Sequence, residues 1–134
     1  MGIPENNQAA GKAHLIDRLH WGVALTPLTT LILFYSSILH AGITLGEWPG
    51  QGGIDLKELT QTNVPLGIHT VLVFIFLALT SLSPLAWLVL PSQAHRIPSL
   101  SAYGIRFVAF IACLSFTLWV GMTDPGGFLN WFFD

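Results

Sequence analysis

Three apolar runs, each long enough to cross a bilayer, constrain the fold of this chain more than any other feature. They extend over residues 22–45, 64–90 and 104–123 of a sequence of 134 residues. A membrane-spanning helix needs about 20 predominantly apolar residues, and a helix satisfies every backbone polar group within its own segment. The runs therefore predict an all-α, integral membrane three-helix bundle that forms one transmembrane domain over residues 1–134.

The composition agrees with this prediction. Charged residues make up only 9% of the chain and hydrophobic residues 52%, whereas charged residues are about 25% of an ordinary soluble domain. Before the first run, residues 12–21 bring Leu15 and Leu19 together at helical spacing. This pattern predicts a short N-terminal interfacial helix that leads into the first span, with Trp21 as an anchor at the headgroup level.

The basic residues lie almost entirely on one side of the predicted bundle. Lys12 and Arg18 precede the first span, Arg96 and Arg106 lie around the second loop, and Lys57 alone falls on the other side. Because basic residues are retained on the cytoplasmic side, we expect a cytoplasmic N-terminus and an external C-terminus. The expected location is a bacterial inner membrane or a thylakoid-type membrane.

Two of the five histidines lie inside the apolar runs at matching depth. His40 is near the C-terminal end of the first run and His69 near the N-terminal end of the second, so antiparallel helices place both toward the external face. At a rise of about 1.5 Å per residue, they lie roughly 9 Å and roughly 12 Å from the middle of their runs, against a hydrocarbon half-thickness of about 15 Å. Ionisable side chains at such a depth usually face another helix and indicate function.

Haem b is the first candidate ligand of this pair, with His40 and His69 as its metal ligands. A b-type haem needs two neutral imidazoles on facing helices, apolar walls and small residues that let the ring enter. Space near the histidines would come from Gly42 and Gly67, and walls from Phe34, Phe74 and Phe76. Two alternatives stay open: a chlorophyll-type pigment on a single histidine, or imidazoles that only hydrogen-bond across a helix contact.

A second pair, His20 and His95, lies at or beyond the opposite edge of the hydrocarbon. Histidine is common at that level, so a solvated and exposed pair is the favoured interpretation, and His14 is expected to be solvated as well. Haem binding is the other interpretation. If both pairs bound haem, the protein would carry electrons across the membrane.

The residues around His20 resemble a known pattern. Arg18-Leu19-His20-Trp21, followed by Gly22, Ala24 and a long apolar run, is similar to the opening of the first helix in membrane b-type cytochromes of the cytochrome b561 kind and of the hydrogenase or formate dehydrogenase kind. The arginine is one position closer to the histidine than in those proteins, which usually have four or more spans. The resemblance implies that His20 is a haem ligand.

No arrangement of residues points to catalysis by the chain alone. The sequence has no Cys-x-x-Cys motif, no paired carboxylates in a span and no His-Glu metal motif, and Cys113 is its one cysteine. We therefore expect a membrane subunit of a larger redox or photosynthetic complex that exchanges electrons with quinone. The alternative is a structural, accessory subunit without a redox cofactor. Nothing in the sequence indicates nucleic-acid binding.

Two further features predict local structure. Pro27 in the first run and Pro84 in the second each predict a bend in a helix. The tail over residues 128–133 is too apolar to remain in water, so we expect it to lie in the external interface or to dock into a partner subunit.

Overall fold

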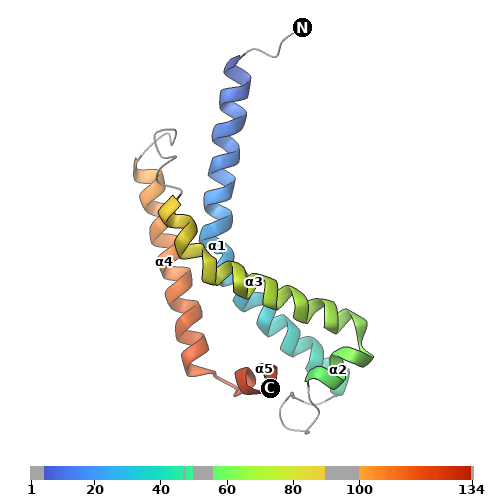
Figure 1. The fold of residues 1–134 in the computed structure, drawn as a ribbon. Helices are drawn as coiled ribbons and strands as arrows, with labels where there is room; N and C mark the ends of the chain where they lie inside the picture. Colours follow the sequence, from blue (N-terminus) through green and yellow to red (C-terminus); the bar gives the residue numbers. More distant parts are fainter. Residues whose placement is uncertain (1–4, 47, 50–55, 90–99, 134) are drawn as a thin grey trace.

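The computed structural model describes residues 5–46, 48–49, 56–89 and 100–133, and within these ranges it contains helices and no strand. The helices are α1 (Glu5–Leu45), α2 (Leu56–Thr62), α3 (Val64–Val89), α4 (Leu100–Thr123) and α5 (Phe128–Phe133). The helices α2 and α5 are short, and Figure 1 shows that they lie at the same end of the molecule. The all-α prediction is confirmed.

Three helices among the described residues are long and apolar enough to cross a membrane. They cover Asp17–Leu45, Val64–Val89 and Ala102–Thr123, close to the predicted spans at 22–45, 64–90 and 104–123. Leu90 lies outside the described residues. The chain is therefore an integral membrane protein with three candidate spans.

The long helices are arranged around α1, which packs against both α3 and α4. In Figure 1, α3 and α4 lie close together where the chain passes from one to the other, and they diverge toward the opposite end. We call the end at which α1 begins the upper end, and the end that carries α2 and α5 the lower end. The helices α3 and α4 are therefore farther apart at the lower end than at the upper end.

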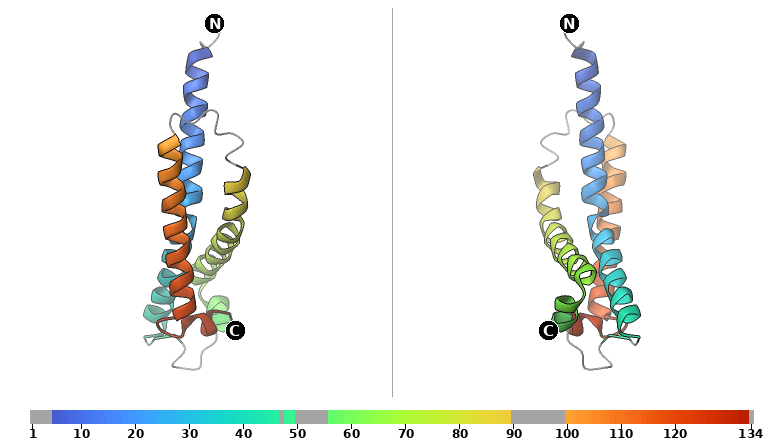
Figure 2. Two further views of the ribbon diagram at one scale, coloured as in Figure 1. Left: turned by 90° about the vertical axis from the view of Figure 1, so that its left-hand side faces the viewer. Right: turned by 90° about the vertical axis from the view of Figure 1, so that its right-hand side faces the viewer.

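The N-terminal segment differs from the prediction in one respect. We expected a separate interfacial helix over residues 12–21, but α1 is one continuous helix from Glu5 to Leu45. The backbone hydrogen-bond ladder continues because no proline interrupts it before Pro27. Figure 2 shows that the first part of α1 extends beyond the upper ends of the other helices.

Both spans that contain an internal proline bend in Figure 1, α1 around its middle and α3 toward its upper end. In α3 the ring of Pro84 leaves the carbonyl of Thr80 without its helical donor, and the Ser83 hydroxyl donates to that carbonyl at 2.6 Å. Near these prolines, Thr30 Oγ1 of α1 lies 2.6 Å from Thr80 Oγ1 of α3. It also donates to the carbonyl of Phe76 at 3.0 Å. These hydroxyls join α1 to α3 at mid-depth.

The lower end is held by caps at the helix ends. Gly46 ends α1 with a positive φ of 75°, which glycine adopts without strain. Asn63 separates α2 from α3, and its side-chain oxygen accepts a hydrogen bond from the backbone N–H of Leu66 at 3.1 Å. The Asn63 side-chain amide also donates to Thr44 Oγ1 at 3.4 Å. The cap therefore connects α3 to the end of α1.

The apolar tail folds back onto its own chain. Asp124 has a positive φ of 35°, and its carboxylate accepts hydrogen bonds from the backbone N–H groups of Phe128 and Leu129 at 3.0 and 3.2 Å. This turn directs α5 toward α1 and α3, where the ring centroid of Phe132 lies 5.0 Å from that of Phe34. α5 thus buries Phe132 to 3% exposure within this chain, while Phe133 stays 53% exposed. The expectation that the tail lies in the external interface or docks into a partner subunit remains a prediction.

Candidate functional site

The structure brings the predicted histidine pair together at the lower end. His40 in α1 and His69 in α3 have ring centroids 6.0 Å apart, with an angle of 55° between the ring planes. Both side chains are partly exposed. The pair therefore lies at the edge of the contact between α1 and α3, where the two imidazole rings are neighbours and both are partly exposed.

The distance between the rings suits one metal atom bound by both. A metal–nitrogen bond is about 2 Å long and the ring nitrogens lie about 1 Å from the ring centre, so two imidazoles on opposite sides of one metal have centroids roughly 6 Å apart. The separation of 6.0 Å agrees with this value. The distance between the two rings is therefore the one expected for two histidines that are the axial ligands of one haem.

Three of the five residues expected to house the macrocycle pack against other parts of this chain. A Cβ atom at Gly67 would lie 3.2 Å from the backbone oxygen of Thr60 in α2, so α2 occupies the space beside this glycine. Phe34 and Phe74 pack against Phe132 of α5, with centroid distances of 5.0 and 5.6 Å. A flat ring at the histidines must therefore lie on the exposed side of the pair.

The helix contact beside the pair is closed. Ala41, which follows His40, is 0% exposed, and so is Leu66, three residues before His69. Ser37 is also fully buried, and its hydroxyl makes no hydrogen bond with the described residues. Small residues on the histidine face of α1 thus bring the two helices together, as is typical of packing between membrane helices.

His20 lies in a different environment from the one expected. We expected an exposed, solvated side chain, but His20 is 0% exposed. Its ring centroid lies 5.7 Å from Trp87 of α3 and 5.9 Å from Tyr103 of α4. The prediction of exposure is wrong because the three spans converge at the upper end and enclose this position.

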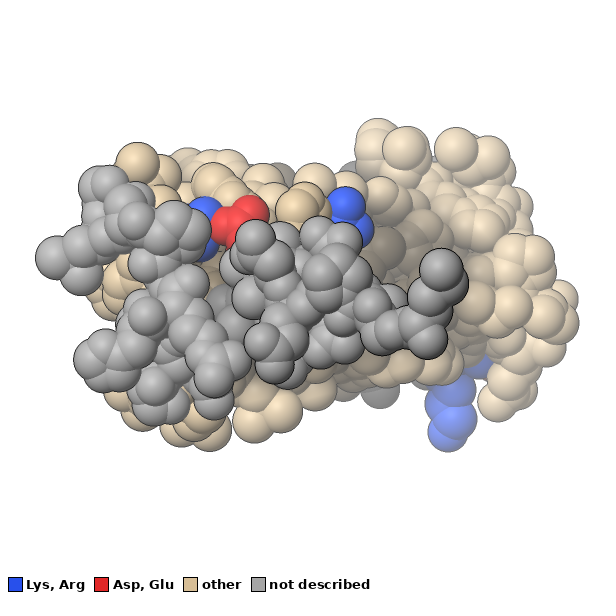
Figure 3. Space-filling view, turned by 90° about the horizontal axis from the view of Figure 1, so that it is seen from above, with Lys and Arg blue, Asp and Glu red and all other residues tan. Residues whose placement is uncertain are grey.

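An ion pair borders the His20 region. Arg106 of α4 is 9% exposed and forms a salt bridge with Asp17 of α1. Its guanidinium carbon lies 5.9 Å from the centroid of the Trp21 ring, a distance typical of a cation–π contact. Figure 3, seen from above, shows acidic and basic side chains in contact on this face. Arg106 therefore links α1 to α4 at the upper end.

Sequence reasoning missed the aromatic partners of His20. Trp87 and Tyr103 were not considered, although antiparallel helices place the end of α3 and the start of α4 at the depth of His20. The same depth argument that paired His40 with His69 could have found them. His95 lies outside the described residues, His14 is exposed as expected, and the described residues contain no group of three or more His, Cys, Asp and Glu side chains that could hold a metal ion.

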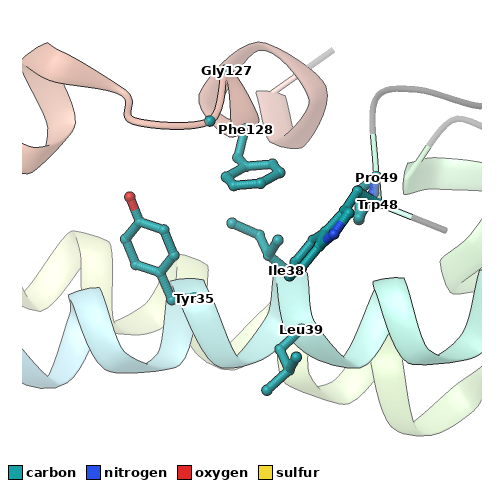
Figure 4. A pocket seen from close by; sticks show the side chains of 8 residues that line it. Tyr35, Ile38, Leu39, Trp48, Pro49, Gly127 and Phe128 are labelled. Atoms are coloured by element: carbon teal, nitrogen blue, oxygen red, sulfur yellow. The ribbon is translucent and has the colours of Figure 1, made fainter.

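Several cavities lie in the lower half of the molecule, and two of them share Tyr35 in their walls. The first of these, about 550 Å³, is lined by residues of four helices and is here called the membrane cavity; its walls include Thr30, Phe34, Thr80, Thr117, Gly121 and Phe133. The second, about 500 Å³, lies beside it at the lower end, and Figure 4 shows Phe128 above Ile38 and Trp48 at its rim. Tyr35 lines both cavities. Neither histidine of the lower pair is in either wall.

Comparisons with known proteins identify no relative. The chain matches no known family model, no curated protein and no solved structure.

Proposed function

We propose that this chain is a membrane subunit of a larger redox or photosynthetic complex, in which His40 and His69 are the axial ligands of haem b and electrons pass to or from quinone. The observation that carries the proposal is the distance of 6.0 Å between the two ring centroids. Two histidines from antiparallel spans at one depth are an unusual and energetically costly feature in a membrane unless they serve a function.

The chain's own residues have defined parts in this proposal. α1 and α3 hold the two imidazoles next to each other, and beside the pair the Asn63 side-chain amide donates to Thr44 Oγ1 at 3.4 Å. Neutral imidazole nitrogens are the donors that haem iron takes as axial ligands. When bound, haem b supplies one-electron transfer.

The exposed side of the pair supports the expectation of partner subunits. Gly67 packs against α2, and Phe34 and Phe74 pack against α5, so this chain offers two ligands and only part of a haem pocket. The other walls would come from neighbouring subunits that cover the exposed edges of His40 and His69. Under this proposal the complex, and not the isolated chain, completes the site.

The orientation is also part of the proposal. Arg18 and the Asp17–Arg106 ion pair lie at the upper end, and Lys57 lies in α2 at the lower end. By the positive-inside rule the upper end is cytoplasmic and the histidine pair is near the external face of a bacterial inner membrane or a thylakoid-type membrane. A reporter fused at Met1 is expected on the cytoplasmic side and one fused at Asp134 outside, and two termini on one side would contradict three spans.

Two other functions follow from specific observations. The partial exposure of both imidazoles would allow each to bind the metal of a separate chlorophyll-type pigment. The packing of Gly67 against α2 and of Phe34 against α5 favours a structural subunit, in which the histidines only contribute to the helix contact.

The absorption spectrum of the complex purified from its native membrane distinguishes these functions. Reduced-minus-oxidised haem bands support haem b, long-wavelength bands support a pigment, and protein absorption alone supports the structural role. In the haem case, His40→Ala and His69→Ala should each remove most of the cofactor, since a six-coordinate iron needs both ligands. The matched control is His14→Ala, which changes an exposed histidine of the same chain.

The double variant separates the functions further. With one shared haem, the double variant should resemble either single variant, whereas two separate pigments should be lost independently and additively. Full cofactor content in the double variant would end the ligand hypothesis for both histidines.

A further inference from the structure

An open pocket at the lower end is lined by aromatic rings from three separate parts of the chain, and we call it the aromatic pocket. Tyr35 comes from α1, Trp48 from the residues that follow α1, and Phe128 from the start of α5. Figure 4 shows Tyr35 on one side of the pocket and Phe128 and Trp48 on the other. Its volume of about 500 Å³ falls within the range of about 300–1,000 Å³ that is usual for small-molecule sites.

The rings of the aromatic pocket keep surface that a bound molecule can contact. Trp48 is 54% exposed, and Tyr35 and Phe128 are half-buried. The ring centroid of Trp48 lies 6.2 Å from that of Phe128, with an angle of 39° between the ring planes. A ligand can therefore reach aromatic surface from outside the bundle without displacing side chains of the core.

The chain next to the aromatic pocket carries negative charge. The described wall residues include no charged side chain, but a carboxylate oxygen of Asp124 lies 3.0 Å from the backbone nitrogen of Phe128, which is in the wall. In the sequence, the stretches 46–55 and 124–134 supply wall residues, and each contains two acidic residues and no basic one. Coulomb attraction therefore favours a positively charged group in the pocket over an anion.

The depth of the aromatic pocket indicates which positive group it meets. Trp48 follows the lower end of α1, and Gly126 and Gly127 follow the lower end of α4, so the pocket lies where the spans leave the hydrocarbon. Tryptophan and tyrosine are enriched at this level, beside the lipid headgroups. An ammonium group is attracted to the face of an aromatic ring. Aliphatic side chains would hold an acyl chain as well as aromatic ones do, but they lack this attraction.

We propose that the aromatic pocket binds the headgroup of phosphatidylethanolamine from the leaflet at the lower end, with its ammonium group against the rings of Tyr35, Trp48 and Phe128. The charge of Asp124 adds to the preference for this headgroup. The headgroup of phosphatidylglycerol carries a negative charge and no ammonium group, so the same walls do not favour it. The inference does not rest on haem at the histidine pair, because neither histidine of that pair lines the pocket.

Trp48 offers a direct test, because its exposed ring can be exchanged without opening the core. Trp48→Phe keeps an aromatic face, whereas Trp48→Leu keeps only apolar surface. The matched control is Trp119→Leu, because Trp119 is 57% exposed, close to the 54% of Trp48, and lies on α4 outside the pocket wall. The full chain is reconstituted in nanodiscs with equal amounts of phosphatidylethanolamine and phosphatidylglycerol and transferred to mild detergent. Native mass spectrometry then counts the lipids that remain bound.

The wild type and Trp119→Leu are expected to retain phosphatidylethanolamine over phosphatidylglycerol by about fivefold, and Trp48→Phe most of this preference. Trp48→Leu should lower the preference about two- to fivefold, the size of a cation–π contact at a partly exposed site. The ligand has a matched control as well. Phosphatidylethanolamine acetylated on its nitrogen keeps the rest of the headgroup but has no positive charge, so the wild type should retain it no better than phosphatidylglycerol.

Equal retention of the two lipids by the wild type overturns the proposal. An unchanged preference in Trp48→Leu does so too, because Trp48 would then be only an anchor at the interface. The same holds if Trp119→Leu loses as much preference as Trp48→Leu, or if the acetylated lipid is retained like the unmodified one. Circular dichroism shows that each compared variant keeps the helix content of the wild type. Haem content is read separately from the absorption spectrum, so this proposal and the proposed function fail independently.

Discussion

His20 at the upper end and the His40–His69 pair at the lower end are histidines of the same bundle in opposite environments. His20 is 0% exposed and lies beside Trp87 and Tyr103, whereas His40 and His69 are partly exposed and lie next to each other. At the upper end three spans converge, while at the lower end α3 has moved away from α4 (Figure 1). The divergence of two helices thus leaves one histidine enclosed and two accessible.

This difference bears on what each region can do. A fully buried histidine that packs against two aromatic rings contributes mainly to packing within its own chain, and its replacement opens a void. A pair at an open edge contributes less packing and can accept a ligand from a neighbouring subunit. The predictions below test this contrast, beginning with the largest effect on stability.

His20→Ala should destabilise the protein far more than His40→Ala. Removing a fully buried ring leaves a cavity that costs about 2–4 kcal/mol, while truncating a partly exposed ring should cost about 1 kcal/mol or less. The comparison is made by reversible unfolding in mixed detergent micelles, with His14→Ala as the control for an exposed site. Equal losses for His20 and His40 would mean that the two environments do not differ in packing.

The sequence predicted one side of this contrast and not the other. Hydrophobic run lengths predicted the spans, and depth matching predicted the meeting of His40 with His69. The burial of His20 was not predicted, because the runs define the length of each helix and not the angle at which α3 leaves α4. The direction in which α5 folds back was also not predicted. It depends on the positive φ of Asp124 and on the hydrogen bonds that the Asp124 carboxylate accepts from two backbone N–H groups.

The lower region should depend on α5 more than on its histidines. Phe132 is 3% exposed and contacts both α1 and α3, whereas its neighbour Phe133 is 53% exposed. Phe132→Ala should therefore cost about 2–3 kcal/mol and Phe133→Ala less than about 1 kcal/mol. Unfolding of the two variants under the same detergent conditions measures the difference. Should Phe133→Ala be the more damaging, α5 would be held by lipid or by a partner instead of by α1.

The ion pair of the upper region should have a smaller, salt-dependent effect. Arg106→Met keeps much of the side-chain volume but removes the charge that pairs with Asp17 and contacts Trp21. The Asp17 side chain is 44% exposed, so water solvates the carboxylate that remains, and the expected loss is about 1 kcal/mol. Repeating the measurement at high ionic strength should reduce the difference between wild type and variant. A loss that is insensitive to salt would indicate packing by the arginine stem.

The smallest effect is expected where the two regions join, at Thr30 and Thr80. Their hydroxyl oxygens lie 2.6 Å apart, and Thr30 also lies 3.0 Å from the carbonyl oxygens of Thr26 and Phe76. Thr80→Val leaves Thr30 with both carbonyls, while Thr30→Val removes every one of these contacts, so Thr30→Val should be the more destabilising of the two. A double-mutant cycle should give a coupling energy of about 0.6 kcal/mol and at most about 1.7 kcal/mol, the range measured for hydrogen bonds between membrane helices. A coupling near zero would show that the hydroxyl pair does not hold α1 to α3, and the contrast between the enclosed and the open end would then rest on side-chain packing alone.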